Sequence, residues 1–200
     1  MPKKQYIKTY MATDATALSA ISKVGHITSE QLNECGMSDK RIRNFVKQGY
    51  LEKVSYRNQS KQFDHCYKLT EAGRNFYDHR DGREHSYYQS VSPQHDIAIA
   101  DKYFSLGEHE RSTWMTESEI RSEFLADIED LRNQGDVARA YQLEDAYKSR
   151  DISAVDAVYE TEEGIRIGYE VVTNSYGHTE LQAKAEFVQV MKLKYEPQRI

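Results

Sequence analysis

Helix-terminating residues recur at short intervals in the first fifty residues and divide them into three short helical segments. The apolar residues between Thr13 and Val24 lie three or four positions apart, which is the spacing of an amphipathic helix. Thr28 and Gln31 match a capping box, so a second, short helix is expected after them. A third helix is expected over residues 38–48. A glycine, the residue that most readily forms a helix C-terminal cap, closes each segment: Gly25, Gly36 and Gly49.

The sequence then changes to an alternating, β-prone pattern. Residues 50–56 and 63–69 predict two paired strands, and Thr70 is in position to cap a further helix. Helix 38–48 and the turn between the strands, residues 57–62, are both basic. We expect the following side chains to contact a nucleic acid: Lys40, Arg41, Arg43, Asn44 and Lys47 on the helix, and Arg57 and Lys61 on the turn.

Charge is divided unevenly along the chain. Residues 1–80 carry 14 Lys and Arg against 8 Asp and Glu, a net charge of +6, whereas residues 81–200 carry 13 against 24, a net charge of −11. Contacts of Lys and Arg with phosphates supply much of the affinity of DNA-binding proteins. The basic part is therefore expected to bind double-stranded DNA, and the acidic part to point away from the phosphates.

Five short stretches within residues 12–80 carry a family resemblance: Ile27-Thr28-Ser29-Glu30-Gln31-Leu32, Gly36-Met37-Ser38, Arg41-Ile42, Gly49-Tyr50-Leu51 and Leu69-Thr70-Glu71-Ala72-Gly73-Arg74. Together with the order of the elements, they resemble the winged helix-turn-helix domains of bacterial and phage regulators and replication accessory proteins. The resemblance implies that helix 38–48 lies in the major groove and that the basic turn contacts a minor groove or phosphates. Lys and Arg would then meet phosphates and guanine edges, and Asn44 would meet adenine.

Residues 81–94 are polar and include one of the chain's three prolines, so we expect a linker there. It would join a first domain at residues 1–80 to a second at residues 95–200. The elements predicted for the second domain are a helix at 95–106, a strand at 111–120, helices at 124–131 and 137–147, strands at 151–159 and 165–172, and a helix at 179–194.

Two carboxylates, Asp156 and Glu170, stand on the two predicted strands that would form a hairpin. With the stretches His95 to Asp101 and Trp114 to Glu117, this order resembles the replication-relaxation family of plasmids and phages, in which a winged helix precedes a PD-(D/E)xK restriction-endonuclease-like module. The resemblance implies Mg²⁺ held by Asp156 and Glu170 beside a scissile phosphate, with a lysine that stabilises the developing charge.

The family's lysine stands two residues after the glutamate, and Val172 occupies that position here. Lys184 on the next helix is the candidate replacement. Asp156, Glu170 and Lys184 are thus the candidate catalytic residues, and Asp156 and Glu170 the candidate metal ligands. These residues could also have no functional role. Carboxylates of a hairpin can face water or cap backbone amides, and the cations of helix 38–48 can form a solvated helix face.

The predicted fold class is α+β, an N-terminal winged helix-turn-helix followed by a C-terminal α/β restriction-endonuclease-like module with a helical insertion. Three functions remain open. The first is duplex DNA binding by a regulator, or a replication or mobilisation accessory factor, of a phage or plasmid type. The second is a Mg²⁺-dependent endonuclease, and otherwise no cofactor is expected. The third is an adaptor that binds a partner protein, or a second copy in a homodimer, through residues 95–200.

Composition excludes several other classes of protein. The mean hydropathy is −0.81, and the longest strongly apolar run, Ile97 to Ala100, is too short for a transmembrane helix. Residues 1–6 lack the apolar segment of a secretory signal, so a cytoplasmic protein is expected. Cys35 and Cys66 are expected to be free, buried thiols, and the seven histidines show no metal-binding spacing.

Overall fold

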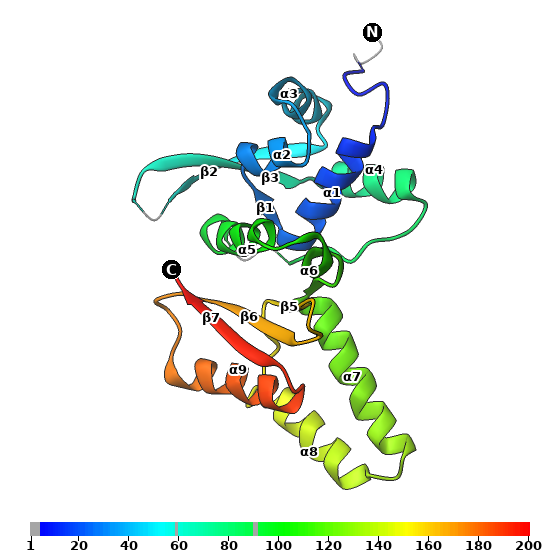
Figure 1. Ribbon diagram of the computed structural model, residues 1–200, viewed down its shortest axis with the longest axis vertical. Helices are drawn as coiled ribbons and strands as arrows, with labels where there is room; N and C mark the ends of the chain where they lie inside the picture. The colour runs from blue at the N-terminus through cyan, green and yellow to red at the C-terminus, as the bar shows by residue number, and fades with distance from the viewer. Residues whose placement is uncertain (1–4, 59, 90–91) are drawn as a thin grey trace. The chain divides into compact units, whose positions relative to one another are not determined.

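The computed structural model describes residues 5–58, 60–89 and 92–200, and the chain divides into two compact units, Met1–Ser105 and Leu106–Ile200. Both units mix helices with a small sheet, so the chain belongs to the α+β class (Figure 1). Part of three predictions lies outside the described residues: the start of the chain at 1–4, Gln59 in the basic turn, and Ser90 and Val91 in the linker. In the described part, no helix is long and apolar enough to cross a membrane.

The first unit begins with the three helices that the capping residues predict. They are α1 (Ala12–Val24), α2 (Ser29–Glu34) and α3 (Asp39–Gln48). The Thr28 hydroxyl accepts a hydrogen bond from the Gln31 amide at 3.2 Å, and the Gln31 side chain accepts one from the Thr28 amide at 3.0 Å. At the start of α3 the Ser38 hydroxyl accepts a hydrogen bond from the Arg41 amide at 3.3 Å, and Gly49 ends the helix in the left-handed conformation.

The sheet of the first unit contains the two predicted strands and one that the sequence did not indicate. β2 (Leu51–Arg57) and β3 (Phe63–Leu69) pair antiparallel from Leu51 opposite Leu69 to Arg57 opposite Phe63. The added strand, β1 (His26–Ile27), pairs with β3 and gives the order β1-β3-β2. Two residues are too few to show an alternating pattern, which is why β1 escaped prediction. Helix α4 (Glu71–Asp81) follows the sheet and is capped by Thr70, as predicted.

The next helix, α5 (Pro93–Ser105), packs within the first unit, although the sequence analysis assigned residues 95–106 to the second domain. Two contacts between buried or half-buried side chains hold α5 in the first unit. The Asp96 carboxylate lies 2.8 Å from His26 Nδ1 of β1, and the Gln31 side chain donates to Asp101 at 2.8 Å. The division between the units therefore follows α5, at residues 105 and 106, and does not lie within the proposed linker at 81–94.

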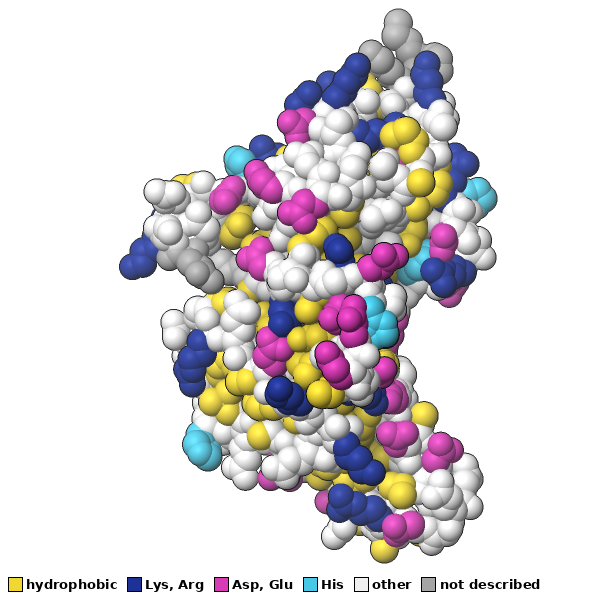
Figure 2. Space-filling view, in the orientation of Figure 1, with side chains coloured by type: hydrophobic (Ala, Val, Ile, Leu, Met, Phe, Trp, Pro, Cys, Tyr) yellow, Lys and Arg dark blue, Asp and Glu magenta, His cyan; other side chains and the backbone are white. Residues whose placement is uncertain are grey.

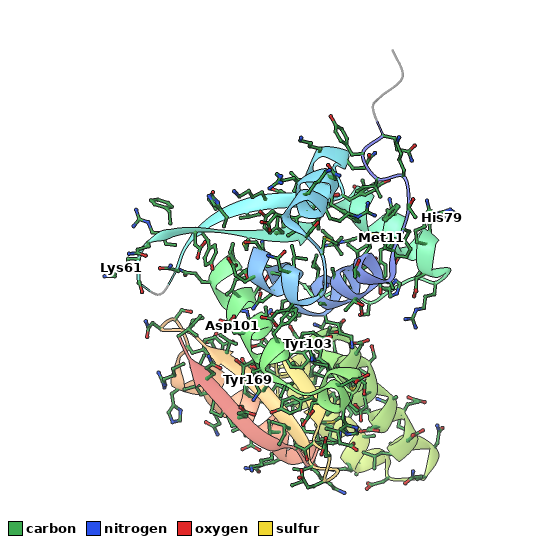
Figure 3. All side chains as sticks on the ribbon, turned by 45° about the horizontal axis from the view of Figure 1, so that its top comes forward. Met11, Lys61, His79, Asp101, Tyr103 and Tyr169 are labelled. Carbon is green, nitrogen blue, oxygen red and sulfur yellow. The ribbon has the colours of Figure 1, made fainter. Side chains whose placement is uncertain are left out.

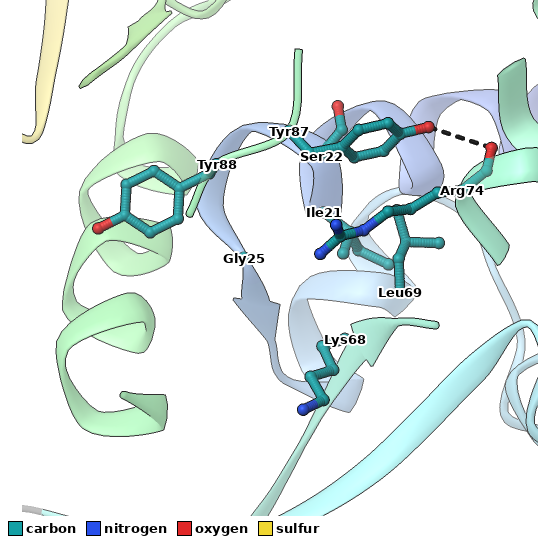
Figure 4. A pocket seen from close by; sticks show the side chains of 8 residues that line it. All are labelled: Ile21, Ser22, Gly25, Lys68, Leu69, Arg74, Tyr87 and Tyr88. Carbon is teal, nitrogen blue, oxygen red and sulfur yellow. Dashed lines mark hydrogen bonds between the residues drawn. The ribbon is translucent and has the colours of Figure 1, made fainter. Parts of the chain in front are cut away.

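Part of that linker is packed against the first unit. Tyr88 is buried and its amide donates to the Ser22 carbonyl at 2.7 Å, while the Tyr87 hydroxyl donates to the Arg74 carbonyl at 3.1 Å. Both tyrosines line a cavity of about 20 Å³ that also touches Ile21 and Leu69 (Figure 4). A cavity of this size holds about one water molecule, so it is a packing defect and not a ligand site.

The second unit is a four-stranded sheet with helices. In chain order its elements are α6 (Glu108–Ser112), β4 (Met115–Thr116), α7 (Glu117–Asn133), α8 (Val137–Lys148), β5 (Ala157–Glu160), β6 (Arg166–Val172), α9 (His178–Val190) and β7 (Lys194–Arg199). The strand order is β4-β5-β6-β7; the first three strands run antiparallel, and β7 runs parallel to β6 after the crossover through α9. Buried side chains of α7, α8 and α9 form a core with β5, around Phe124, Phe187 and Val158.

The bounds of three predicted elements of this unit were wrong. The strand expected at residues 151–159 is Ala157–Glu160, so Asp156 precedes it. The strand expected at residues 111–120 is only Met115–Thr116, because the Thr116 amide is capped by the Glu119 side chain at 2.7 Å and α7 begins at once. The last helix, expected over 179–194, ends at Val190, and the chain turns into β7. Strand β7 contains a proline and few apolar residues, so its sequence lacked a strand pattern.

Candidate functional site

Helix α3 has one buried and one exposed side. Ile42 and Phe45 are buried, whereas Lys40, Arg43 and Lys47 are exposed and Asn44 is half-buried. The three exposed cations are three and four positions apart, so they lie on one face of the helix. Figure 2 shows Lys and Arg side chains over α3, and dark blue also marks the outer edge of the β2–β3 hairpin.

Arg41, which the sequence analysis grouped with these cations, points into the fold. Its Nε and Nη2 atoms donate to the two carboxylate oxygens of Asp14 at 2.9 and 2.5 Å, and Nη2 also donates to the Thr9 carbonyl. Asp14 is fully buried in α1. Arg41 therefore joins α3 to α1 and is not part of the exposed cationic face. No sequence signal distinguished it from its neighbours, since its partner is 27 residues away.

A groove lies between α3 and the sheet. It has a volume of about 380 Å³ and is lined by Ser29, Asp39, Ile42, Arg43, Val46, Lys47, Lys53 and Tyr67. Three of these side chains are cations and one is an acid, so the groove is basic. Because Arg43 and Lys47 of α3 share it with Lys53 of β2 and Tyr67 of β3, the helix and the hairpin present one continuous surface.

The hairpin carries the other two predicted cations. Arg57 is exposed at the end of β2, with its guanidinium 5.0 Å from the centre of the exposed Phe63 ring. Lys61 is exposed at the tip, in the left-handed conformation with φ of 60° (Figure 3). Lys53, Phe63 and Tyr67 belong to the same surface and were missed by the sequence analysis, although the alternation of the strands would have placed them on one side.

In the second unit the three candidate catalytic residues lie in contact. Lys184 Nζ is 3.0 Å from Glu170 Oε1. Glu170 Oε2 accepts a hydrogen bond from the Asp156 amide at 3.0 Å, and Asp156 Oδ2 accepts one from the Val171 amide at 2.8 Å. Asp156 lies just before β5, Glu170 on β6 and Lys184 on α9, so the order of the elements brings them together.

This carboxylate–lysine cluster is buried: Glu170 is 0% exposed, Asp156 4% and Lys184 9%. Tyr176, from the loop between β6 and α9, donates to Glu170 Oε1 at 2.7 Å, and Lys184 also donates to the Ala154 carbonyl at 2.5 Å. Burial raises the pKa of Glu170 to about 7, and the negative charge of Asp156 adds to the rise; Lys184 and Tyr176 oppose it. Sequence reasoning missed Tyr176, which no motif marks.

The cluster does not fit a magnesium site. Both oxygens of Glu170 accept hydrogen bonds from the protein, and the Lys184 ammonium occupies the place of a cation beside the carboxylate. Mg²⁺ needs octahedral oxygen ligands and keeps several of its waters, for which such a buried cluster leaves little space. Across the described ranges, no group of three or more His, Cys, Asp or Glu side chains is arranged to hold a metal ion.

Both cysteines are free thiols, as expected. Cys66 is buried, and burial raises its pKa to about 12, whereas Cys35 is half-buried and not fully buried as expected. A raised pKa disfavours the thiolate, so Cys66 is not marked as a nucleophile by its surroundings. No protein-family model matches the chain, and comparisons with curated proteins and with solved structures found no similar protein.

Proposed function

We propose that this chain binds duplex DNA through a winged helix-turn-helix in its first unit, with α3 in the major groove and the β2–β3 hairpin as the wing. The observation that carries the proposal is the exposed row of Lys40, Arg43 and Lys47 on α3, continuous through one basic groove with Lys53 on the hairpin. Cations on one surface of a helix and its neighbouring strands match the phosphates that border a DNA groove.

The order of the elements supports the same proposal. Two short capped helices precede α3, and a two-stranded hairpin with a basic end follows it. Arg43 and Lys47 suit phosphates or guanine edges, and Asn44 suits adenine. Arg57 and Lys61 suit the backbone that flanks the major groove. Arg41 is left out of this interface because its guanidinium is engaged by the buried Asp14.

Duplex binding by the full chain tests the proposal. Fluorescence anisotropy with a labelled random-sequence duplex should show binding that is lost when Lys40, Arg43 and Lys47 are all changed to Ala. A matched variant with three exposed cations of the second unit changed to Ala should bind like the wild type: Arg139, Lys194 and Arg199. Equal affinity of the two variants would contradict the assignment of α3.

A second candidate function for the second unit is a metal-dependent endonuclease with a restriction-endonuclease-like fold. The convergence of Asp156, Glu170 and Lys184 on three consecutive elements favours it, and the closed, hydrogen-bonded cluster opposes it. Nicking of supercoiled DNA in Mg²⁺ or Mn²⁺ that disappears in Asp156→Asn would establish an endonuclease. If no cleavage is found, the adaptor function of the acidic unit remains. Sedimentation of the full chain with and without DNA tests whether it forms a homodimer, and a monomer under both conditions would contradict this.

A further inference from the structure

The β2–β3 hairpin carries three aromatic rings on one face. Tyr67, His65 and Phe63 alternate along β3, and alternate residues of a strand point to the same side. Directly opposite them on β2 stand Lys53, Ser55 and Arg57, in that order. We call this the ring face of the hairpin. On it Lys53 lies opposite Tyr67, Ser55 opposite His65 and Arg57 opposite Phe63.

The contacts across the strands order these side chains. The Arg57 guanidinium lies 5.0 Å from the centre of the Phe63 ring, and Ser55 Oγ lies 3.1 Å from His65 Nδ1. Tyr67 shares the groove of about 380 Å³ with Lys53 and with the α3 cations Arg43 and Lys47. Each ring is therefore held next to a polar or charged group.

The ring face is the outward face of the hairpin. Phe63 is 75% exposed, and His65 is also exposed. Among the side chains that point the other way, Val54 is half-buried and Cys66 is buried, and α5 packs against β2. Burial and the charge of Asp96 from α5 raise the pKa of Cys66. Helix α5 thus covers the inward face, and the fold does not use the Phe63 ring for its core.

The spacing of the rings selects a kind of ligand. Residues two apart on a strand are about 6.7 Å apart, whereas the bases of one strand in a duplex are about 3.4 Å apart. Consecutive bases could each meet one ring only on a strand that is unpaired and extended. Rings that alternate with cations are the features by which proteins hold single strands: bases stack on the rings and phosphates pair with the cations.

We propose that the ring face of the β2–β3 hairpin binds a single-stranded nucleic acid, with bases stacked on Phe63, His65 and Tyr67 and phosphates held by Arg57, Lys53 and the groove cations. This goes beyond the proposed duplex binding, with which it shares Arg43 and Lys47. The protein would then hold one strand of an opened duplex next to the duplex that α3 binds.

The experiment measures the affinity of the full chain for three labelled probes. They are a dT oligonucleotide and a U oligonucleotide, each of about 12 nucleotides, and a duplex. Phe63→Ala should weaken oligonucleotide binding by at least about fivefold, the lower limit for loss of one stacked base, and weaken duplex binding clearly less, because a paired base cannot stack on the ring. His65→Ala should act in the same direction. Phe63→Trp should restore binding, and Phe63→Leu should not, because stacking needs a ring.

Tyr141→Ala is the matched control, since Tyr141 of α8 is 68% exposed and lies in the other unit. It should leave oligonucleotide binding unchanged. The dT and U probes distinguish DNA from RNA as the strand that is held. Duplex binding without oligonucleotide binding would overturn this inference and leave the proposed function intact; oligonucleotide binding without duplex binding would do the reverse. Restoration by Phe63→Leu would also overturn it, because it would indicate an apolar protein contact.

Discussion

Arg41 and Asp14 form a two-point ion pair between α3 and α1, with donor–acceptor distances of 2.5 and 2.9 Å. The Asp14 side chain is 0% exposed and that of Arg41 14%. Asp14 also accepts a hydrogen bond from the Met11 amide at 2.8 Å, so the same carboxylate caps α1. The pair therefore fixes the position of α3, whose outer face is the proposed DNA-binding surface.

The first prediction is that Arg41→Ala destabilises the protein by about 3–5 kcal/mol, because it leaves the Asp14 carboxylate buried without its cation. Chemical denaturation measures this change. Lys40→Ala, at the exposed neighbouring position, should change stability by no more than about 0.5 kcal/mol. If both variants were equally stable, Arg41 would belong with the surface cations after all.

The second prediction concerns pH. The pKa of Glu170 is about 7 in the folded protein, against an ordinary value of 4.5, because the carboxylate is buried beside Asp156. Between these two pH values the folded state binds more protons than the unfolded state, so the contribution of Glu170 to stability is complete below pH 4.5 and is lost as the pH rises to about 7. The loss is on the order of 3 kcal/mol.

Denaturation of the wild type and of Glu170→Gln between pH 4.5 and 7 isolates this group. The stability of the wild type relative to the variant should fall as the pH rises across that window, and should be constant above it. A difference that is independent of pH would mean that Glu170 titrates at its ordinary value.

The third prediction concerns Gly73 in α4. A Cβ atom at this position would lie 2.0 Å from the Tyr50 carbonyl oxygen, a backbone atom that cannot move away cheaply. Alanine favours a helix over glycine by about 1 kcal/mol, but a contact this short outweighs that gain, so Gly73→Ala should destabilise the protein by about 1–3 kcal/mol or more. Thermal unfolding measures this change. In that assay Asn75→Ala, on the exposed side of the same helix, should be neutral or slightly stabilising. A stabilised Gly73→Ala would mean that α4 and Tyr50 are not in contact.

Local signals in the sequence predict much of the first unit. Thr28, Ser38 and Thr70 each cap a helix by accepting a hydrogen bond from the amide three residues later, so each signal and its partner are neighbours in the sequence. The position of α5 depends on contacts such as His26 with Asp96, 70 residues apart, and no local pattern records them. For this reason the local pattern at residues 81–94 predicts a boundary before α5, whereas α5 packs in the first unit.

At the candidate sites, too, the sequence shows which residues to consider but not the contacts that they make with distant residues. Asp156, Glu170 and Lys184 could be selected from a family pattern, and they do lie together. Their burial and the hydrogen bond from Tyr176 could not be predicted, because both depend on how α9 and its preceding loop pack. Likewise, charge patterning on α3 could not separate Arg41 from Arg43, since only the fold shows that Asp14 lies within reach of one of them.

The salt dependence of duplex binding tests the central claim most directly. Each phosphate contact adds about 0.9 to the slope of log K against log salt concentration. Changing Lys40, Arg43 and Lys47 together to Ala should therefore make the slope shallower by about 2–3, whereas the control with Arg139, Lys194 and Arg199 changed to Ala should keep the wild-type slope. Parallel lines for wild type and the α3 variant would contradict the account, because α3 would then make no contact with the phosphates of DNA.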